Sequence, residues 1–289
     1  MRASTGNRAI VFKKEDGLLD RPISVPCGRC IGCRLERSRQ WAMRCLHEAS
    51  LYERNCFITL TYNDQHLPYD RSLNVHHFQK FMKRLRKKYG DGIRFFHCGE
   101  YGELEQRPHY HACIFNHDFP DRQLWTVRND VPLYTSAELE ELWPYGFSTI
   151  GDVTFESAAY VARYVVKKVV GDKAEDHYRY TCEITGQVFD RCPDYTTMSR
   201  RPGIGKGWID KFLTDVYPSD TVIINGRECR PPRFYDKVFE LLHSSHSQAN
   251  KARRIRDSKK HACDQADGRL IVREEVAERR LEKLPRSLQ

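Results

Sequence analysis

Short runs of β-branched and aromatic residues alternate along this chain with longer stretches in which apolar residues recur every three or four positions. The short runs predict strands over residues 56–62, 93–99, 109–116 and 147–153. The longer stretches predict helices over residues 34–54, 75–89, 136–143, 157–170 and 270–284. Asn74 and Gly90 bracket the second helix as capping residues. Strands that alternate with helices predict an α+β fold, in which helices pack against a sheet.

The strand predicted over residues 109–116 carries two histidines on one face. Side chains alternate between the faces of a strand, so His109 and His111 point the same way and can bind one cation. Glu100 ends the preceding strand, just before a glycine-containing turn, and is the predicted third ligand. Imidazole and carboxylate ligands with open positions suit Mg²⁺ or Mn²⁺. The alternative is a pair of half-buried strand histidines that bind no metal.

The helix predicted over residues 157–170 carries two tyrosines, Tyr160 and Tyr164, whose Cβ atoms would lie about 5–6 Å apart. They share a face with Lys167 and Lys168. A separate apolar stripe comprises Ala158, Val161, Ala162, Val165 and Val169. We therefore expect the stripe to pack on the sheet and both hydroxyls to face a cleft, where the lysines would favour phenolate and contact phosphate. Packing tyrosines and an ordinary basic helix end are the alternatives.

Three cysteines near the beginning of the chain, Cys27, Cys30 and Cys33, follow a C-x-x-C-x-x-C spacing. Zinc is the leading interpretation, with Cys45 or His47 as the fourth ligand. An iron–sulfur cluster is less favoured, because no suitably placed fourth cysteine is present. A glycine-containing loop of free thiols is the remaining alternative. The eleven cysteines are an odd number, and no export signal is evident, so we expect reduced thiols in the cytosol.

The charge of the chain suits a polyanionic partner. Lysine and arginine number 48, aspartate and glutamate 39, and the formal net charge is +9. Arg200, Arg201 and Lys206 lie in a glycine-containing segment and are candidate DNA phosphate contacts. A basic stretch over residues 251–260 predicts a nucleic-acid-binding arm or a solvated extension. The sequence contains no membrane-spanning apolar run and no nucleotide-hydrolysis motif, so we expect unwinding to depend on a separate helicase.

Several motifs resemble those of one group of enzymes. Pro108-His109-Tyr110-His111 resembles the metal motif of HUH endonucleases, and the segment from Tyr160 to Lys168 resembles the paired-tyrosine motif of initiators from small single-stranded DNA phages. The segments Phe57–Tyr62, Met198–Trp208 and Pro26–Cys33 also agree with the microvirus group. Over roughly residues 20–210, the chain therefore resembles the rolling-circle replication initiators of gokushovirus-type microviruses.

This resemblance implies an HUH endonuclease fold, with a central antiparallel sheet flanked by helices. It implies a cysteine-rich segment over residues 1–55, an endonuclease core over 56–215 and a basic extension over 216–289. It also implies that Tyr160 or Tyr164 nicks origin DNA, keeps the 5′-phosphate and later rejoins the strand. Single-stranded and origin DNA, a host helicase and a host DNA polymerase are the implied partners, in the host cell cytoplasm. The alternative is a non-catalytic, zinc-dependent nucleic-acid-binding protein.

Overall fold

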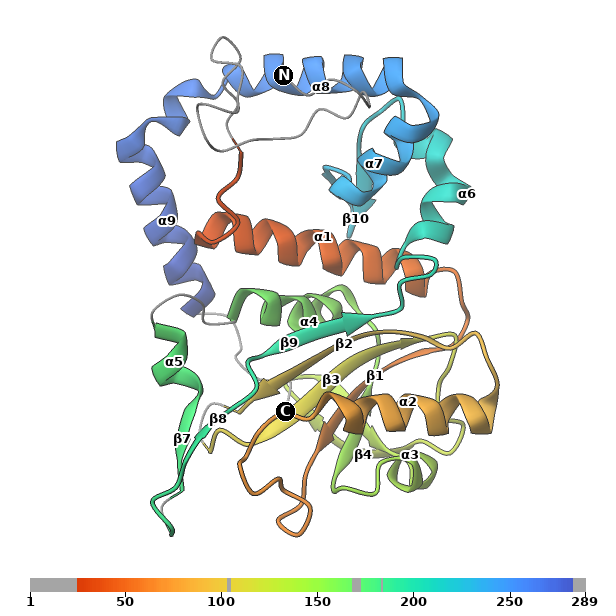
Figure 1. Ribbon diagram of the computed structural model, residues 1–289. Coiled ribbons are helices and arrows are strands. Elements are labelled where there is room, and N and C mark those ends of the chain that lie inside the picture. Colours follow the sequence, from red (N-terminus) through yellow and green to blue (C-terminus); the bar gives the residue numbers. More distant parts are fainter. Residues whose placement is uncertain (1–24, 103–104, 168–172, 183, 283–289) are drawn as a thin grey trace, which may run out of the picture.

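A seven-stranded antiparallel sheet forms the centre of the protein in the part of the chain that the structure describes (Figure 1). The computed structural model describes residues 25–102, 105–167, 173–182 and 184–282, with the backbone alone for residues 163–167, 173 and 281–282. From edge to edge the strands are β4 (Gln123–Arg128), β5 (Val131–Thr135), β6 (Ser148–Gly151), β1 (Asn55–Thr61), β3 (Pro108–Phe115), β2 (Arg94–Tyr101) and β9 (Tyr195–Met198).

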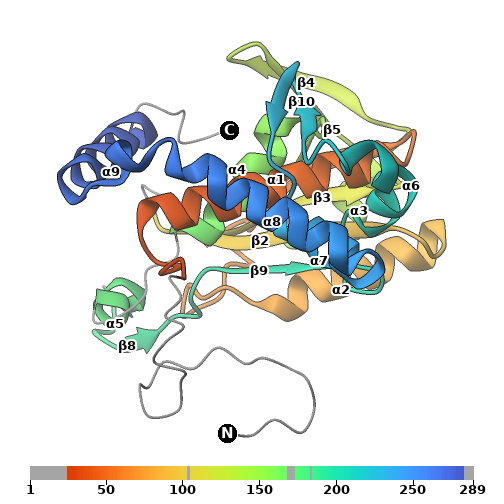
Figure 2. The same cartoon turned by 90° about the horizontal axis from the view of Figure 1, so that it is seen from above.

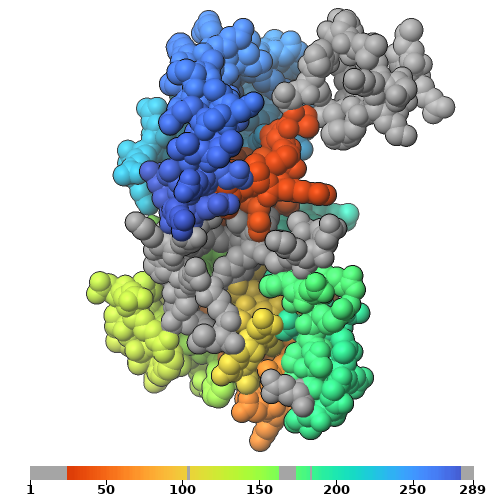
Figure 3. Space-filling model, turned by 90° about the vertical axis from the view of Figure 1, so that its left-hand side faces the viewer, coloured from red at the N-terminus to blue at the C-terminus, as the bar shows by residue number. Residues whose placement is uncertain are grey.

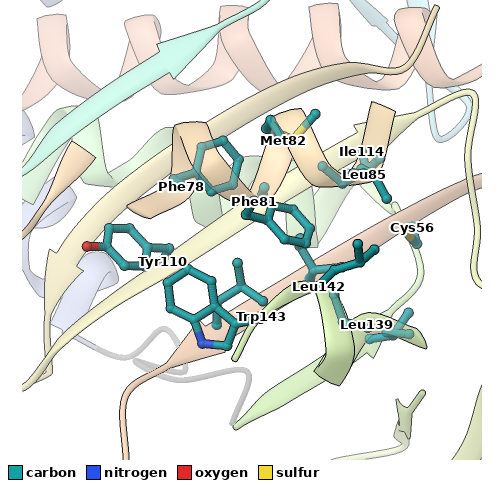
Figure 4. Close-up of a cluster of buried hydrophobic side chains, with 14 of the residues drawn as sticks. Cys56, Phe78, Phe81, Met82, Leu85, Tyr110, Ile114, Leu139, Leu142 and Trp143 are labelled. Carbon is teal, nitrogen blue, oxygen red and sulfur yellow. The ribbon is translucent and has the colours of Figure 1, made fainter. Parts of the chain in front are cut away.

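Helices cover both faces of the central strands, and every residue of β3 is therefore buried. Helices α2 (Val75–Tyr89) and α3 (Ala137–Leu142) lie on one face. Their apolar side chains pack with alternate residues of β1 and β3 in a cluster that includes Trp143 and Tyr110 (Figure 4). The Asn74 side chain accepts a hydrogen bond from the His76 backbone N–H, which caps α2 as predicted.

Helices α1 (Ile31–Ala49) and α4 (Phe155–Lys167) lie on the opposite face of the sheet (Figures 1 and 2). The other set of alternating strand residues, including Phe96 and Cys113, packs here against Ala42 of α1 and Val161 of α4. Trp41 of α1 stacks on Phe96 with ring centroids 4.9 Å apart. This face, between the sheet and two helices, also receives the side chains of His109 and His111.

The C-terminal part of the chain packs against the outer side of α1. Its elements are α6 (Lys206–Val216), β10 (Val222–Ile224), β11 (Arg227–Cys229), α7 (Arg233–Leu242), α8 (Ser244–Lys259), the short helix Ala262–Gln265 and α9 (Asp267–Glu282). Met43 of α1 shares a buried cluster with Ile209, Val222 and Tyr235. Contacts thus cross both predicted domain boundaries, at residues 55/56 and 215/216; the boundaries themselves stay predictions.

Two smaller features project from the same end of the molecule (Figure 3). The first comprises helix α5 (Lys173–Tyr178) and the ribbon of β7 (Arg179–Thr181) and β8 (Val188–Asp190). The second is the β4–β5 ribbon at the sheet edge, where Leu124, Trp125 and Val127 are exposed.

The predicted strands and helices are present, with ends that differ by a few residues. The sequence did not predict the β4–β5 ribbon, which turns through Asn129 and Asp130, both at positive φ. It also did not predict β9, which pairs with β2 across about a hundred residues of chain. Along the described ranges, no helix combines the length and apolar composition needed to cross a lipid bilayer.

Candidate metal centre and tyrosine helix

Glu100, His109 and His111 come together at one end of the central sheet. In the antiparallel pairing of β2 with β3, Glu100 lies opposite His109, and His111 is two residues further along β3. Both imidazoles therefore point toward the face covered by α1 and α4. Glu100 Oε1 lies 2.8 Å from Nε2 of His109 and 2.8 Å from Nε2 of His111. The register of two neighbouring strands thus brings the three predicted ligands to one point.

Hydrogen bonds on the far side of each imidazole orient its Nε2 atom. His109 Nδ1 donates to the backbone carbonyl of Arg107 at 3.1 Å, and His111 Nδ1 lies 2.9 Å from Thr59 Oγ1. Because a carbonyl oxygen only accepts, a neutral His109 carries its proton on Nδ1 and directs the Nε2 lone pair at Glu100. A cation between them would satisfy both atoms. The three ligand atoms lie within 4.8 Å of one another, so this donor set fits a divalent cation.

The Glu100 carboxylate is ionised although it is buried. Burial alone would raise the pKa of Glu100, but hydrogen bonds from His109 and His111 outweigh that effect and lower the pKa to about 2. The site therefore holds a fixed negative charge at neutral pH. A buried carboxylate beside two imidazole nitrogens is an environment that attracts a cation.

Tyr160 packs against this centre from helix α4. Its ring stands edge-on to His111, with centroids 5.0 Å apart, and edge-on to Phe57 at 6.5 Å. Tyr160 is 5% exposed and shares a buried cluster with Val161 and Ala162. The sequence prediction placed Tyr160 on a face apart from the packed stripe. That prediction is wrong, because α4 is covered by the sheet on one side and by α1 on another.

The rest of the tyrosine motif follows along α4. Tyr164 lies one turn beyond Tyr160, and Lys167 ends the helix, with the backbone alone described for both. Lys168 lies outside the described residues. Helix geometry sets the Cβ atoms of the two tyrosines about 5–6 Å apart. The roles of Tyr164, Lys167 and Lys168 stay predictions.

Comparison with known proteins places this arrangement in a family. The family model for the replication-associated protein ORF2 matches residues 55–169, from β1 through the tyrosine helix. Replication-associated protein VP4 of Bdellovibrio phage phiMH2K is 35% identical over 230 residues, which cover 76% of this chain and 69% of that protein. Replication-associated protein ORF2 of Spiroplasma virus 4 is 33% identical over 231 residues, with 75% and 68% covered. The chain belongs to the microvirus replication-associated proteins.

A third relative of this replication-associated protein is more distant. Replication-associated protein ORF4 of Chlamydia phage 1 is 31% identical over 235 residues, which cover 78% of this chain and 55% of that protein. No solved structure matches the chain. The antiparallel sheet with flanking helices confirms the α+β architecture that the resemblance implied.

The glycine-containing segment of the replication-associated protein lies at the opposite end of the sheet. The Gly205 backbone N–H donates to Glu48 Oε2 at 2.6 Å, and Glu48 Oε1 accepts from Arg94 Nε at 2.5 Å. Arg94 begins β2 and Glu100 lies six residues along it, a span of about 20 Å. Arg200 and Arg201 are exposed, whereas Lys206 forms an ion pair with Asp210. Their predicted DNA contacts would therefore lie away from the metal centre.

The three clustered cysteines lie just before and within the first turn of α1. Their Sγ atoms lie within 4.8 Å of one another. The predicted fourth ligands are wrong. Cys45 is buried with Phe96 and Cys113 in the core, and His47 Nδ1 lies 2.9 Å from the Tyr235 hydroxyl while its ring stacks on Trp208. Both lie three or more helical turns from Cys33, at about 1.5 Å per residue.

Sequence reasoning missed several residues beside the metal centre. Thr59 was recognised only as part of a core strand, although it is directly opposite His111 in the β1–β3 pairing. Tyr178 donates to Asp194 Oδ2 at 2.8 Å, and both side chains are buried. Burial raises the pKa of Asp194, and the nearby Glu100 charge raises it further. Only the fold brings residues 178 and 194 next to Glu100, so no local sequence signal marks them.

Proposed function

We propose that this protein initiates rolling-circle DNA replication by nicking one strand with a tyrosine and later rejoining it. The observation that carries the proposal is the packing of Tyr160 against His111, one of three converging metal-ligand candidates. A nucleophile-bearing helix beside a His-His-carboxylate centre is the equipment for transesterification at a phosphate. The names of the relatives support a role in replication.

His109, His111 and Glu100 would hold Mg²⁺ or Mn²⁺. When bound, such a cation polarises the scissile phosphate and orients it. Thr59 and the Arg107 carbonyl would keep the two Nε2 atoms directed at the cation. The Glu100 carboxylate would lower the net charge of the occupied centre, so that the anionic phosphate and the cation remain balanced.

The tyrosines would perform the strand transfer. A phenol oxygen attacks the phosphorus, the bond from phosphorus to the 3′-oxygen breaks, and the leaving oxygen takes up a proton as the phenol loses one. The products are a tyrosine ester of the 5′-phosphate and a free 3′-hydroxyl, which a host polymerase would extend while a host helicase unwinds the duplex. Because a phenol has an unperturbed pKa of about 10, Lys167 and Lys168 would assist by favouring phenolate.

Two tyrosines on one helix suit a second transfer. After one round, the tyrosine that is still free attacks the regenerated junction. The new 3′-hydroxyl then attacks the first phosphotyrosine ester, which releases that tyrosine and closes a single-stranded circle. Tyr160 and Tyr164 would thus exchange roles from one round to the next inside the host cell.

A covalent adduct tests the proposal directly. Wild-type protein is incubated with labelled circular single-stranded viral DNA and Mn²⁺, and label that stays with the protein after denaturation is measured. We expect an adduct from wild type and from the control Tyr134→Phe, and none from the Tyr160→Phe/Tyr164→Phe double variant. An adduct from the double variant would move the nucleophile elsewhere, with Tyr178 and Tyr180 the next candidates. DNA binding without any adduct from wild type would favour the non-catalytic alternative.

A further inference from the structure

A second cluster of metal-ligand candidates lies outside the His–Glu centre. Cys27 Sγ and Cys33 Sγ are 3.8 Å apart, and the Cys30 backbone N–H donates to Cys27 Sγ at 3.3 Å. For tetrahedral zinc with Zn–S bonds of about 2.3 Å, two thiolate sulfurs are separated by about 3.8 Å. A disulfide requires about 2.05 Å. The observed separation thus matches two ligands of one ion.

The rest of the protein does little to hold these thiols together. Residues 25–30 are all exposed, and Cys30 begins α1 without a side-chain capping hydrogen bond. Gly28 takes a positive φ of 75°, which turns the loop so that Cys27 faces the helix. In the described ranges, the hydrogen bonds of this loop run within it or to the first turn of α1. Three exposed sulfurs converge without a hydrophobic core, as in small domains organised by zinc.

The direction of α1 determines where this loop lies. Glu48, near the end of α1, binds Arg94 at the beginning of β2, and Trp41 stacks on Phe96. The helix therefore runs antiparallel to β2, and its first turn lies toward the end of β2 that carries Glu100. Figure 1 shows the two at the same end of the molecule, and Figure 3 shows residues near position 30 projecting on that face.

The loop also carries positive charge without matching acidic partners. Arg29 and Arg37 are exposed and form no ion pair with any residue that the structure describes, whereas Arg39 pairs with Glu36. The first turn of α1 contains no acidic residue. An exposed, unpaired guanidinium next to a helix N-terminus suits a phosphate oxygen.

We propose that Cys27, Cys30 and Cys33 bind one zinc ion, and that the zinc holds Arg29 in place as a contact for DNA phosphate. Three described thiolates converge, which leaves the fourth position of the ion to an exogenous donor such as water. The zinc site stands on the thiol geometry alone. The DNA contact rests on the proposed function.

Metal analysis tests the zinc site independently of nicking. Protein is purified under reducing conditions in a His111→Ala background, so that the His–Glu centre does not contribute. We expect about one zinc per chain, and a thiolate-to-metal absorption band after exchange with Co²⁺. Cys30→Ser should lose both signals, whereas Cys192→Ser and Cys263→Ser, which change exposed cysteines elsewhere, should keep them. Folded protein without zinc and without the cobalt band would overturn the site, as would iron with sulfide.

DNA affinity tests the contact in the Tyr160→Phe/Tyr164→Phe background, which binds without cleaving. We expect Arg29→Ala to weaken binding of single-stranded DNA several-fold at low salt and to retain zinc. Arg227→Ala, which changes an exposed arginine on β11, should leave affinity unchanged. Equal effects of the two substitutions, or none from Arg29→Ala, would overturn the contact and leave the zinc site standing. Loss of nicking in wild type with normal zinc content would instead overturn the proposed function.

Discussion

Thr59 Oγ1 lies 2.9 Å from Nδ1 of His111, the nitrogen that faces away from Glu100. This contact orients the ring, so Thr59→Val should leave the three ligands in place but weaken metal binding. Loss of such a partner typically costs 10–100-fold in metal affinity. We expect the Mn²⁺ concentration for half-maximal cleavage to rise by roughly that factor, with nearly full activity at saturation.

Thr61→Val is the matched control, because the Thr61 hydroxyl donates to the Phe147 carbonyl rather than to an imidazole. It should leave the Mn²⁺ dependence unchanged. A loss of maximal rate in Thr59→Val at unchanged Mn²⁺ affinity would show that Thr59 does not act through His111.

His111→Ala should abolish cleavage and spare most of the affinity for DNA, because phosphate contacts elsewhere supply that affinity. Glu100→Gln should behave similarly, since the amide is nearly isosteric but lacks the charge that the cation requires. Cleavage and filter binding measured on the same preparations separate the two effects. Undiminished cleavage by His111→Ala in the presence of EDTA would contradict the metal centre.

Each single variant, Tyr160→Phe and Tyr164→Phe, should still form a covalent adduct but release few closed circles, because the second transfer needs both hydroxyls. The readout is the ratio of circular product to adduct. Phe keeps the ring of Tyr160 in the core, whereas Tyr160→Ala should lower the free energy of unfolding by about 3–5 kcal/mol. Normal circle release by either single variant would contradict the alternation and leave a one-tyrosine mechanism.

Stability should fall in mild acid because buried histidines must become charged. Burial lowers the pKa of His47 to about 4, from an ordinary value of about 6.5. Between these values the unfolded chain binds more protons, so the folded state loses stability as pH falls from 6.5 to 4. For His47 alone the loss is about 3 kcal/mol.

His47→Gln should therefore flatten the fall in unfolding free energy between pH 7 and 4, measured by denaturant titration. Part of the fall should remain, because burial also lowers the pKa of His97 and His117. The control His246→Gln changes an exposed histidine and should leave the profile as in wild type. An unaltered profile in His47→Gln would show that His47 does not contribute.

Local sequence patterns predicted the features that depend on neighbours in the chain. The limits of α2 follow from Asn74 and Gly90, and the shared face of His109 and His111 follows from strand alternation. Glu100 was predictable because a hairpin sets its register against His109. The burial of Tyr160 was not, since it depends on α1, more than a hundred residues away, covering a second side of α4. The pairing of Tyr178 with Asp194 depends on the path of the β7–β8 ribbon and was equally inaccessible.

Helix α1 works as a spacer of fixed length and phase. Fifteen residues separate Cys33 from Glu48, a rise of about 22 Å, which matches the span of about 20 Å from Arg94 to Glu100 in the strand beneath. One inserted residue would rotate the cysteine end by about 100° relative to the Glu48–Arg94 bond and swing the thiols off the face that carries Glu100. Loops of this protein can therefore change length without moving either group of ligand candidates, but α1 cannot, and related chains should keep its residue count even where its sequence differs.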